Sequence, residues 1–332
     1  MSEIQKEIIQ IDGGIGRCID FTGVLKKYCE KNPNKKVDVI CPHADIFFNM
    51  SWINKVYPIN TPYLFETAIK DARYIKPEPY DMYEYYTEMK HITQCFDKQL
   101  TGEEELVLPV IQLSQNELKQ AEMWVSKHKQ ETGKDIVLFQ PHGSSGGKGT
   151  PKPDGTADVM PDESGRSLDQ AFAEKLATEL KKDYEVFIIK NQDQVGIKDF
   201  KTFQGLTLRQ IFALIPYVKA GISCDTFLSH AFAMFGKKCY VLWGSTSPKN
   251  LGYETNMNFT PAKEPTILPN RLPHNMFDTF KQNGEIINGY GDKEIKIIVE
   301  DIKNGSKKVD SQPDSRQDSK VESKEGDTVI SK

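Results

Sequence analysis

The sequence lacks several features that define common classes of protein. No run of about 18 apolar residues occurs, so a membrane-spanning helix is not expected. Residues 1–7 are charged and polar where a secretory signal is apolar, which predicts a cytoplasmic protein. The 6 cysteines form no CxxC pair and have no histidine at ligand spacing, so neither a zinc site nor a disulfide framework is expected.

Neither sign of charge is in large excess. The formal net charge of −4 gives no global attraction to nucleic acid or to an anionic bilayer. The hydrophobic content of 38% in 332 residues is enough to give each of two ordinary domains its own core. Composition therefore predicts a folded two-domain protein and identifies no partner. The sequence does not indicate an oligomeric state.

The dinucleotide-binding fingerprint GxGxxG is also absent. The first apolar run is followed by DGGIGR (residues 12–17), whose glycine spacing differs from the fingerprint, and no acidic residue is well placed after the second run. A nicotinamide-dependent dehydrogenase is therefore not favoured. Gly14 and Gly16 allow either a tight strand-to-helix turn without a ligand or the close approach of a ligand to helix-terminal amides.

Short apolar runs alternate with amphipathic stretches along most of the chain. The runs are rich in Val, Ile, Leu and Phe without a two-residue alternation, which is typical of strands buried on both faces. Segments of helical period lie between them, for example 17–31, 168–181 and 207–215, so we expect parallel sheets covered by helices. The predicted strands are residues 7–11, 37–41, 55–58, 136–140, 185–189, 220–223 and 239–243.

A capping box marks the expected boundary between two domains. Ser114 and Glu117 are spaced as in such a box and open a polar helix that directly precedes a new strand. From about residue 304 the chain has almost nothing apolar to bury, which predicts disorder. The predicted units are an N-terminal domain over 1–113, a connecting helix over 114–134, a C-terminal domain over 135–303 and a tail over 304–332.

The first loop of the predicted C-terminal domain, residues 141–162, is unusually long and rich in Gly and Pro. A loop of this kind is either a functional lid or a tolerated insertion. Its beginning contains Gly143 and Ser144, small and hydroxyl-bearing residues directly after a strand. They suit an anion-binding turn, and they equally suit a plain soluble loop.

Two successive predicted strands near the C-terminus are each followed by a polar cluster. Ligands of open α/β sheets bind at such strand ends, where the next helix presents free N–H groups. Taken alone, a histidine such as His230 is more often a packed core residue than a catalytic one, and the neighbouring Asp225, Thr226 and Thr246 favour the functional interpretation. The clusters comprise Asp225, Thr226 and His230 after the first strand, and Gly244 and Thr246 after the second.

These clusters resemble glycosyltransferase family 9, the heptosyltransferases that build lipopolysaccharide cores. That family shows Asp-(Ser/Thr)-Gly-x-x-His, an Ala-rich helix ending in Gly, a strand and Gly-x-Thr-x-Pro. The resemblance is best over residues 136–248 and looser over 8–58. It implies the GT-B fold, an α/β protein with two Rossmann-like domains facing a central cleft. The matching residues here are Asp225, Thr226, His230, Gly236, Gly244, Thr246 and Pro248.

The resemblance also implies an activity, the inverting transfer of a sugar from a nucleotide-diphosphate sugar to an acceptor hydroxyl on a glycan, a glycolipid or a modified DNA base. It implies no metal and no cofactor, and the absence of a DxD motif near a strand end agrees. Arg166 falls near the basic residue that neutralises the leaving phosphate. The implied donor-binding residues are Gly14, Gly16, Gly143, Ser144, Arg166, Asp225, Thr226, His230, Gly244 and Thr246.

Two positions depart from the family pattern. Phe227 replaces the glycine after Asp-Thr, where it either crowds the phosphate or stacks on the base. Arg17 follows Gly16 where the family has the aspartate thought to be the catalytic base. Asp20, on the same helix face, and Asp12, before the glycines, are the candidate bases, and Arg17 either pairs with Asp20, grips an anionic ligand or is solvated.

The tyrosine-rich segment 80–86 lies in the half where a GT-B enzyme binds its acceptor. Its rings either stack on a sugar or base or simply pack together. Two other functions fit the same architecture: a nucleotide-sugar epimerase, and a binding protein that retains the fold without a catalytic base. An assay of sugar transfer distinguishes them.

Overall fold

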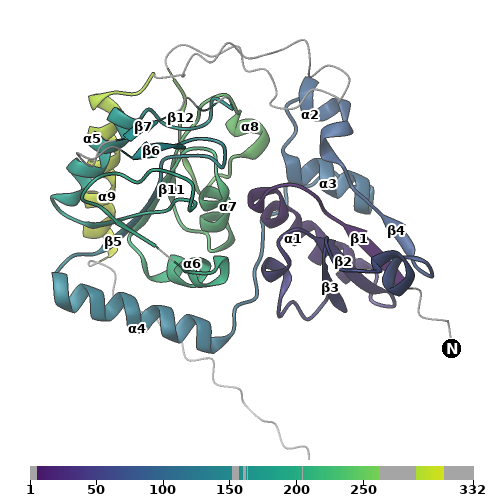
Figure 1. The fold of residues 1–332 in the computed structure, drawn as a ribbon. Helices are drawn as coiled ribbons and strands as arrows, with labels where there is room; N and C mark the ends of the chain where they lie inside the picture. Colours follow the sequence, from purple (N-terminus) through teal and green to yellow (C-terminus); the bar gives the residue numbers. More distant parts are fainter. Residues whose placement is uncertain are drawn as a thin grey trace, which may run out of the picture.

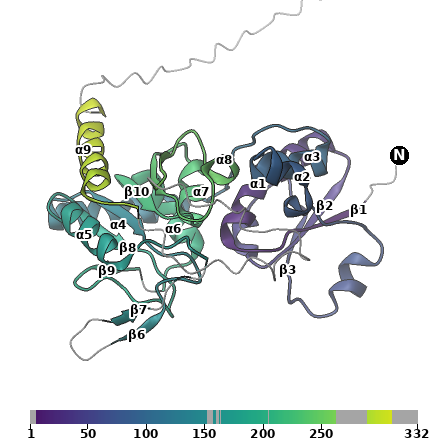
Figure 2. The same cartoon turned by 90° about the horizontal axis from the view of Figure 1, so that it is seen from above.

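Two parallel β-sheets with helices on both faces form the framework of the protein (Figures 1 and 2). The computed structural model describes residues 6–151, 157–159, 162, 164–203, 205–261 and 289–309. We call residues 6–113 the N-terminal half and residues 114–309 the C-terminal half. The predicted α/β class with two parallel sheets is confirmed.

The N-terminal sheet has the strand order β3-β2-β1-β4, and all of its pairings are parallel. Successive residues of β1 point to opposite faces, so Ile9 packs under α1 and α3 while Ile8 packs toward the π-helical turn η2. The elements are β1 (Lys6–Gln10), α1 (Ile15–Lys31), β2 (Lys36–Cys41), η1 (Ala44–Phe47), β3 (Lys55–Pro58), η2 (Phe65–Ile69), β4 (Arg73–Ile75), η3 (Pro79–Asp81), α2 (Tyr83–Thr87) and α3 (Ile92–Thr101).

The C-terminal sheet has the order β12-β11-β10-β5-β8-β9 and is also parallel. Helices α5 and α9 cover one face, and α4, α6 and α7 cover the other. The elements are α4 (Gln115–Thr132), β5 (Ile136–Gln140), β6 (Gly149–Pro151), β7 (Ala157–Val159), α5 (Gln170–Lys181), β8 (Glu185–Ile188), β9 (Lys201–Thr202), α6 (Leu208–Leu214), η4 (Ile215–Tyr217), β10 (Ala220–Ser223), α7 (Phe227–Met234), β11 (Cys239–Leu242), α8 (Pro248–Leu251), β12 (Met257–Phe259) and α9 (Asp292–Val309).

The predicted capping box at the start of α4 is confirmed. The Ser114 hydroxyl accepts from the Glu117 amide at 3.2 Å, and the Glu117 carboxylate accepts from the Ser114 amide at 2.7 Å. The helix ends at Gly133, whose φ of 69° is the left-handed conformation that glycine adopts without strain. The helix packs against α6 in the C-terminal half, so the chain has already crossed between the halves before α4 begins (Figure 1).

The predicted disorder from residue 304 is wrong for residues 304–309, which continue α9. The helix is amphipathic over its earlier turns, where Ile295, Ile298 and Ile302 are buried against the C-terminal sheet side that α5 covers. Once nucleated by this packing, a helix extends at little cost into polar residues. The rest of the predicted tail, residues 310–332, lies outside the described residues.

The two halves share one apolar core. The largest buried cluster joins Phe21 of α1 to Leu228 and Phe232 of α7 without interruption. Figure 1 shows α1 and α7 at the boundary between the two sheets. No helix in the described ranges combines the length and the apolar character needed to span a bilayer.

Polar contacts reinforce this boundary. The buried Arg209 of α6 pairs with Glu117 and also donates to the carbonyl oxygens of Asp45 and Phe48 at 3.2 and 3.1 Å. On the other side, the Asn250 amide group donates to the carbonyl oxygens of Tyr85 and Lys90 at 2.8 and 2.9 Å. Side chains of the C-terminal half thus hold backbone of the N-terminal half.

Candidate active site

A cavity of about 270 Å³ lies between the two halves. Gly14, Gln140, Asn191 and Asp225 line it, and each ends or follows a parallel strand, namely β1, β5, β8 and β10. Open α/β sheets bind ligands at this edge because helix N-termini and free amides gather there. The other lining residues used below are Gly16, Arg17, Asp20, Tyr80, Gly143, Ser144, Arg166, Thr226, Phe227 and His230.

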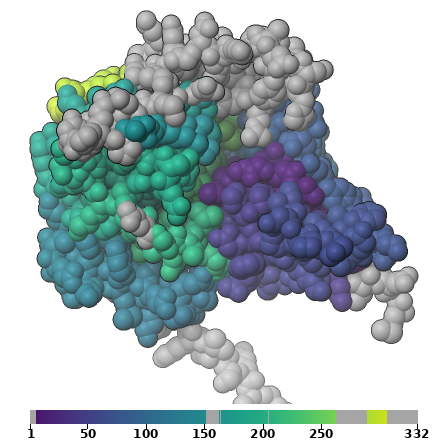
Figure 3. All heavy atoms as spheres, in the orientation of Figure 1, coloured from purple at the N-terminus to yellow at the C-terminus, as the bar shows by residue number. Residues whose placement is uncertain are grey.

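The turn after β1 brings α1 against α7. Gly13 has φ of 100°, a conformation that L side chains rarely adopt, so glycine is required there. At Gly16, an added Cβ would lie 2.9 Å from Cδ2 and 3.2 Å from Nε2 of His230. In Figure 3 the start of α1, in purple, lies against the green surface of the C-terminal half. The glycine therefore permits the close approach of helix and imidazole.

The substitution Gly16→Ala is expected to lower the free energy of unfolding by about 1–3 kcal/mol, the usual cost of overpacking. The imidazole cannot simply turn aside, because it lies between Asp20 and Asp225. Gly14→Ala is the matched control, since an added Cβ there meets nothing within 4 Å. Urea unfolding measures both variants. Equal stability of the two would contradict the close packing of Gly16 on His230.

Four charged or titratable side chains form a row along the cavity: Arg166, Asp225, His230 and Asp20. Nη1 of Arg166 lies 3.9 Å from Oδ2 of Asp225, and Oδ1 of Asp225 lies 3.9 Å from Nε2 of His230. Nδ1 of His230 lies 2.8 Å from Oδ1 of Asp20. Positive and negative groups alternate, so each carboxylate has a cation or an imidazole beside it.

The Asp20 end of this row is closed off from solvent. The Tyr253 hydroxyl donates to Oδ1 of Asp20, and the Tyr253 ring stands edge-on to His91 and His230 at 5.0 and 5.9 Å. Burial lowers the pKa of His91 to about 4, which keeps that imidazole neutral near pH 7. Burial also lowers the pKa of His230, but the adjacent Asp20 carboxylate outweighs it and raises the pKa above its ordinary value.

The Arg166 end is built by a loop around the half-buried carboxylate of Asp162. Asp162 accepts hydrogen bonds from the Ser145 hydroxyl at 2.8 Å, the Ser164 amide at 2.9 Å and the Ser167 amide at 3.0 Å. Burial by itself would raise the pKa of Asp162, but the hydrogen bonds from Ser164, Ser167 and Ser145 outweigh burial and lower the pKa to about 2. The ionised carboxylate ties the two ends of the loop together and so positions Arg166.

The start of α7 provides the third side of the cavity. Thr226 caps this helix, because its hydroxyl accepts from the Leu228 amide at 3.4 Å, and it donates to Oε1 of Gln140 at 2.7 Å. The Phe227 side chain lines the cavity and packs edge-on to Phe212. A capped helix N-terminus beside Arg166 is a suitable environment for an anion.

Several predicted site residues are placed elsewhere or otherwise engaged. Asp12 is not among the lining residues, and its carboxylate pairs with Lys76 at 2.5 Å. Arg17 lines the cavity but pairs with Glu78 at 2.9 Å, so the expected pair with Asp20 is not formed. The reason is geometric: Asp20 is already enclosed by His230 and Tyr253.

The turn that contains Gly244 and Thr246 does not line this cavity. It packs on the Arg166 loop instead, since the Ser245 amide donates to the Gly165 carbonyl oxygen at 3.0 Å. An added Cβ at Gly244 would lie 2.1 Å from that same oxygen. The turn after β11 therefore supports the Arg166 loop and does not line the cavity itself.

The tyrosine-rich segment forms η3 and α2. Tyr85 is buried and meets Tyr80 and Tyr86 edge-on, with ring centroids 5.1 Å apart in both pairs. These contacts agree with the interpretation that the rings of the segment pack together. Tyr80 in addition lines the cavity and lies 5.1 Å from the Arg17 guanidinium, which places one aromatic face beside a cation in the N-terminal half.

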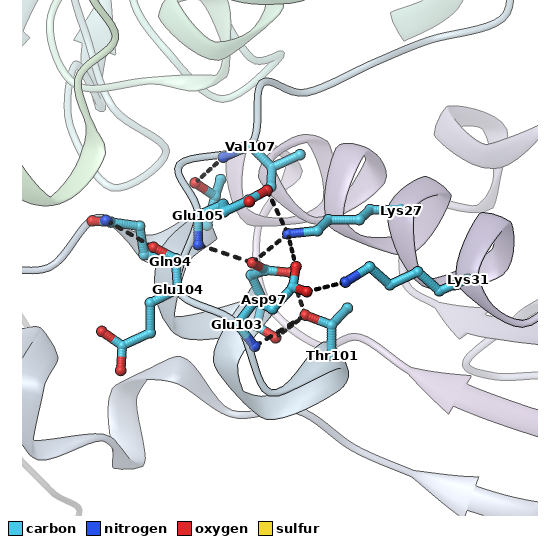
Figure 4. Close-up of polar contacts among 10 residues, drawn as sticks. Lys27, Lys31, Gln94, Asp97, Thr101, Glu103, Glu104, Glu105 and Val107 are labelled. Carbon is cyan, nitrogen blue, oxygen red and sulfur yellow. Dashed lines mark hydrogen bonds and ion pairs between the residues drawn. The ribbon is translucent and has the colours of Figure 1, made fainter.

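A second polar cluster lies away from the cavity (Figure 4). Asp97, Glu103 and Glu105 converge closely enough to hold a metal ion, but Nζ of Lys27 lies 2.7, 2.8 and 2.7 Å from them. The ammonium group occupies the position that a cation would take. We therefore assign this cluster to an ion-pair network that joins α1 to α3.

The fold is similar to that of solved GT-B glycosyltransferases of family 9. A glycosyl transferase family 9 structure from Veillonella parvula DSM 2008 aligns at 10% identity and a TM-score of 0.59 over 91% of this chain and 98% of that one. E. coli ADP-heptose lps heptosyltransferase II aligns at 13% identity and a TM-score of 0.57, over 90% of this chain and 99% of that one. E. coli heptosyltransferase WaaC with ADP-2-deoxy-2-fluoro heptose aligns at 11% identity and a TM-score of 0.51, over 90% of this chain and 99% of that one.

These structural matches confirm the predicted fold. Neither a family profile nor a curated protein sequence matches this chain. Sequence reasoning missed Gln140, Asn191 and Tyr253 as parts of the site. The first two directly end or follow predicted strands and were detectable by that position, whereas Tyr253 carries no local signal.

Proposed function

We propose that the protein is a metal-independent, inverting glycosyltransferase that moves a sugar from a nucleotide-diphosphate sugar to an acceptor hydroxyl. The observation that carries the proposal is the cavity between the halves, where Arg166 and the α7 N-terminus approach His230 and Asp20. The first two groups can stabilise a departing diphosphate, and the last two can take a proton. Sugar transfer from a diphosphate donor to a hydroxyl requires stabilisation of the leaving diphosphate and removal of the hydroxyl proton.

The donor class follows from the charge of the site and from the similar structures. One of these is an ADP-heptose heptosyltransferase, and another contains ADP-2-deoxy-2-fluoro heptose. In this chain the Gly143 and Ser144 turn, Arg166 and Thr226 lie together on the C-terminal side of the cavity. We propose that they hold the diphosphate, with the sugar directed toward α1. The sugar can be a hexose, a heptose or a pentose.

The acceptor is proposed to bind on the N-terminal side, at Tyr80 and Arg17. A glycan, a glycolipid or a hydroxylated DNA base presents a suitable hydroxyl. Asp20 is the carboxylate from this side that we retain for the proton-transfer step, together with His230, because Asp12 is paired with Lys76 and does not line the cavity. Positive groups of the protein balance the leaving charge, so the proposed mechanism needs no metal.

Thermal unfolding with a panel of nucleoside diphosphates and nucleotide sugars tests the proposal first. A ligand at 100 times its Kd stabilises the folded state by about 2.7 kcal/mol, so the correct nucleotide is expected to raise the melting temperature. Transfer of a radiolabelled sugar to glycan, glycolipid and hydroxymethylated DNA acceptors is then measured with and without EDTA. The anomeric configuration of the product is read by NMR.

The outcomes separate the candidate functions. Transfer that persists in EDTA with inverted configuration supports the proposal, and stabilisation by none of the nucleotides contradicts it. Conversion of the donor without any acceptor indicates an epimerase. Nucleotide binding with no transfer to any of the three acceptor classes indicates a binding protein.

A further inference from the structure

We infer that His230 is the group that removes the proton from the acceptor, and that Asp20 acts through it as a positioning residue. This inference rests on the proposed glycosyltransferase function and deepens it by naming the catalytic base. The observations are the enclosure of the Asp20 carboxylate, the orientation of the His230 ring and the charges around that ring.

Both oxygens of Asp20 are withdrawn from a substrate. Oδ1 accepts from the Tyr253 hydroxyl and lies 2.8 Å from Nδ1 of His230. Oδ2 is fully enclosed and has no partner. A base must come within about 2.6–3.2 Å of the hydroxyl that it deprotonates. The carboxylate as placed can reach the imidazole but not an acceptor.

The His230 ring connects this carboxylate to the cavity. Its Nδ1 is enclosed on the Asp20 side, whereas Nε2 on the opposite edge lies 3.9 Å from Oδ1 of Asp225 and close to Gly16, both of which line the cavity. Because Oδ1 of Asp20 lies 2.8 Å from Nδ1, the negative charge of Asp20 favours the tautomer with the proton on Nδ1, which leaves the lone pair on Nε2. The nitrogen that can act as a base thus faces the reactants.

Charged groups from every surrounding element act on this imidazole. Asp20 of α1 and Asp225 after β10 favour its protonated form, whereas burial and Arg166 oppose it, and the balance raises the pKa of His230. His91 of α3 is neutral near pH 7 because burial lowers its pKa to about 4. Tyr253 completes the enclosure as a hydrogen-bond donor. An imidazole in this setting is a stronger base than one in water.

The reaction step balances without a further reactant. The acceptor hydroxyl gives its proton to Nε2 of His230 while its oxygen bonds to the anomeric carbon of the donor sugar. The bond from that carbon to the diphosphate oxygen breaks, and its electron pair leaves with the nucleoside diphosphate beside Arg166. Asp20 stabilises the imidazolium that forms, and Nε2 later releases the proton to solvent.

The test compares the pH dependence of kcat/KM for the wild type, His230→Gln and Asp20→Asn, with Asp183→Asn as the matched control. Asp183 pairs with Lys303 on the surface, far from the row, so its variant is expected to match the wild type. The wild-type rate should rise with pH through one ionisation. His230→Gln should lose about 10²- to 10⁴-fold in rate together with this ionisation, which is the range for general base catalysis.

Asp20→Asn is the variant that isolates positioning. Removing the carboxylate removes the interaction that raises the pKa of His230. The rise of kcat/KM with pH should therefore occur at lower pH than in the wild type and should remain visible. Retention of the nucleoside diphosphate melting shift in each variant confirms that the donor side is folded. If His230→Gln does not fold, the shift of the pH dependence of kcat/KM in Asp20→Asn still tests whether His230 is the base.

Three results overturn the inference. A wild-type rate that falls with rising pH through this ionisation would mean that His230 serves as a cation for the leaving group. Loss of the ionisation in Asp20→Asn, with its retention in His230→Gln, would make Asp20 the direct base. Unchanged kinetics in His230→Gln would remove the imidazole from the mechanism. Absence of transfer by the wild type is a different result, since it contradicts the proposed function itself.

Discussion

Replacing Arg166 by alanine is expected to lower kcat/KM for sugar transfer by about 10²- to 10³-fold, the range for loss of one preorganised group that stabilises transition-state charge. Arg166 is a lining cation whose side chain is 28% exposed, so solvent only partly screens it. The other arginine of the described lining, Arg17, is already paired with Glu78. Among the described lining residues there is no further arginine that could compensate.

Steady-state kinetics and a titration with the donor nucleoside diphosphate measure this effect. Arg166→Lys should retain part of the activity, because it keeps the charge but not the planar fork. Lys148→Ala is the matched control: Lys148 is in the same loop, pairs with Asp193 at 3.0 Å and does not line the cavity. Equal loss in the control and in Arg166→Ala would indicate that the loop is merely disordered by either change.

Replacing Arg209 by methionine is expected to lower the free energy of unfolding by about 1–3 kcal/mol, the cost of leaving hydrogen-bond acceptors without their donor, because Arg209 is buried whereas Glu117 is half-buried. Nε and Nη2 of Arg209 lie 2.6 and 2.9 Å from the two carboxylate oxygens of Glu117. The same guanidinium donates to the carbonyl oxygens of Asp45, Phe48 and Gln112. Methionine fills the volume and leaves all of these acceptors without their donor.

The loss should depend on pH in a defined direction. The hydrogen bonds from Arg209 lower the pKa of Glu117 from 4.5 to about 2 in the folded protein. A carboxylate with a lowered folded pKa contributes stability that is complete above pH 4.5 and disappears as the pH falls toward 2. The difference between wild type and Arg209→Met should therefore shrink across this window.

Urea unfolding at several pH values provides the measurement. Lys182→Met is the control, because Lys182 pairs with Glu179 on the surface, where such pairs contribute only about 0–1 kcal/mol. A constant difference between wild type and Arg209→Met from pH 5 to pH 2.5 would show that Glu117 is not the group involved. An effect no larger than the control would show that the contacts of Arg209 do not contribute to holding the halves together.

Periodicity was sufficient to predict the fold wherever packing is uniform. The strands predicted at 55–58, 136–140 and 220–223 have those bounds in the structure, because continuous apolar runs between breakers have one stable solution inside an α/β layer. Strands β4, β9 and β12 were missed. They are the edge strands or near-edge strands of two or three residues, and pairing with a neighbour rather than composition defines them.

The site was predictable only in part, for a related reason. Residues that follow strand ends, such as Asp225 and Gly143, line the cavity at the edge of the sheet where topology predicts ligand binding. The partners of Asp20 were not, because Tyr253 is separated from it by more than 200 positions and contacts it only after both halves meet. Gly244 was predicted to bind ligand from its motif, yet its missing side chain is explained by the Gly165 carbonyl oxygen.

The apolar cluster that runs from α1 into α7 has a consequence for how the molecule comes apart. A fragment ending before β5 would expose to water the face of α1 that α7 otherwise covers, and the complementary fragment would expose the facing side of α7. Neither piece would be a self-sufficient globule. The halves are thus expected to melt as one cooperative unit, giving a single calorimetric peak, even though their sheets are separate.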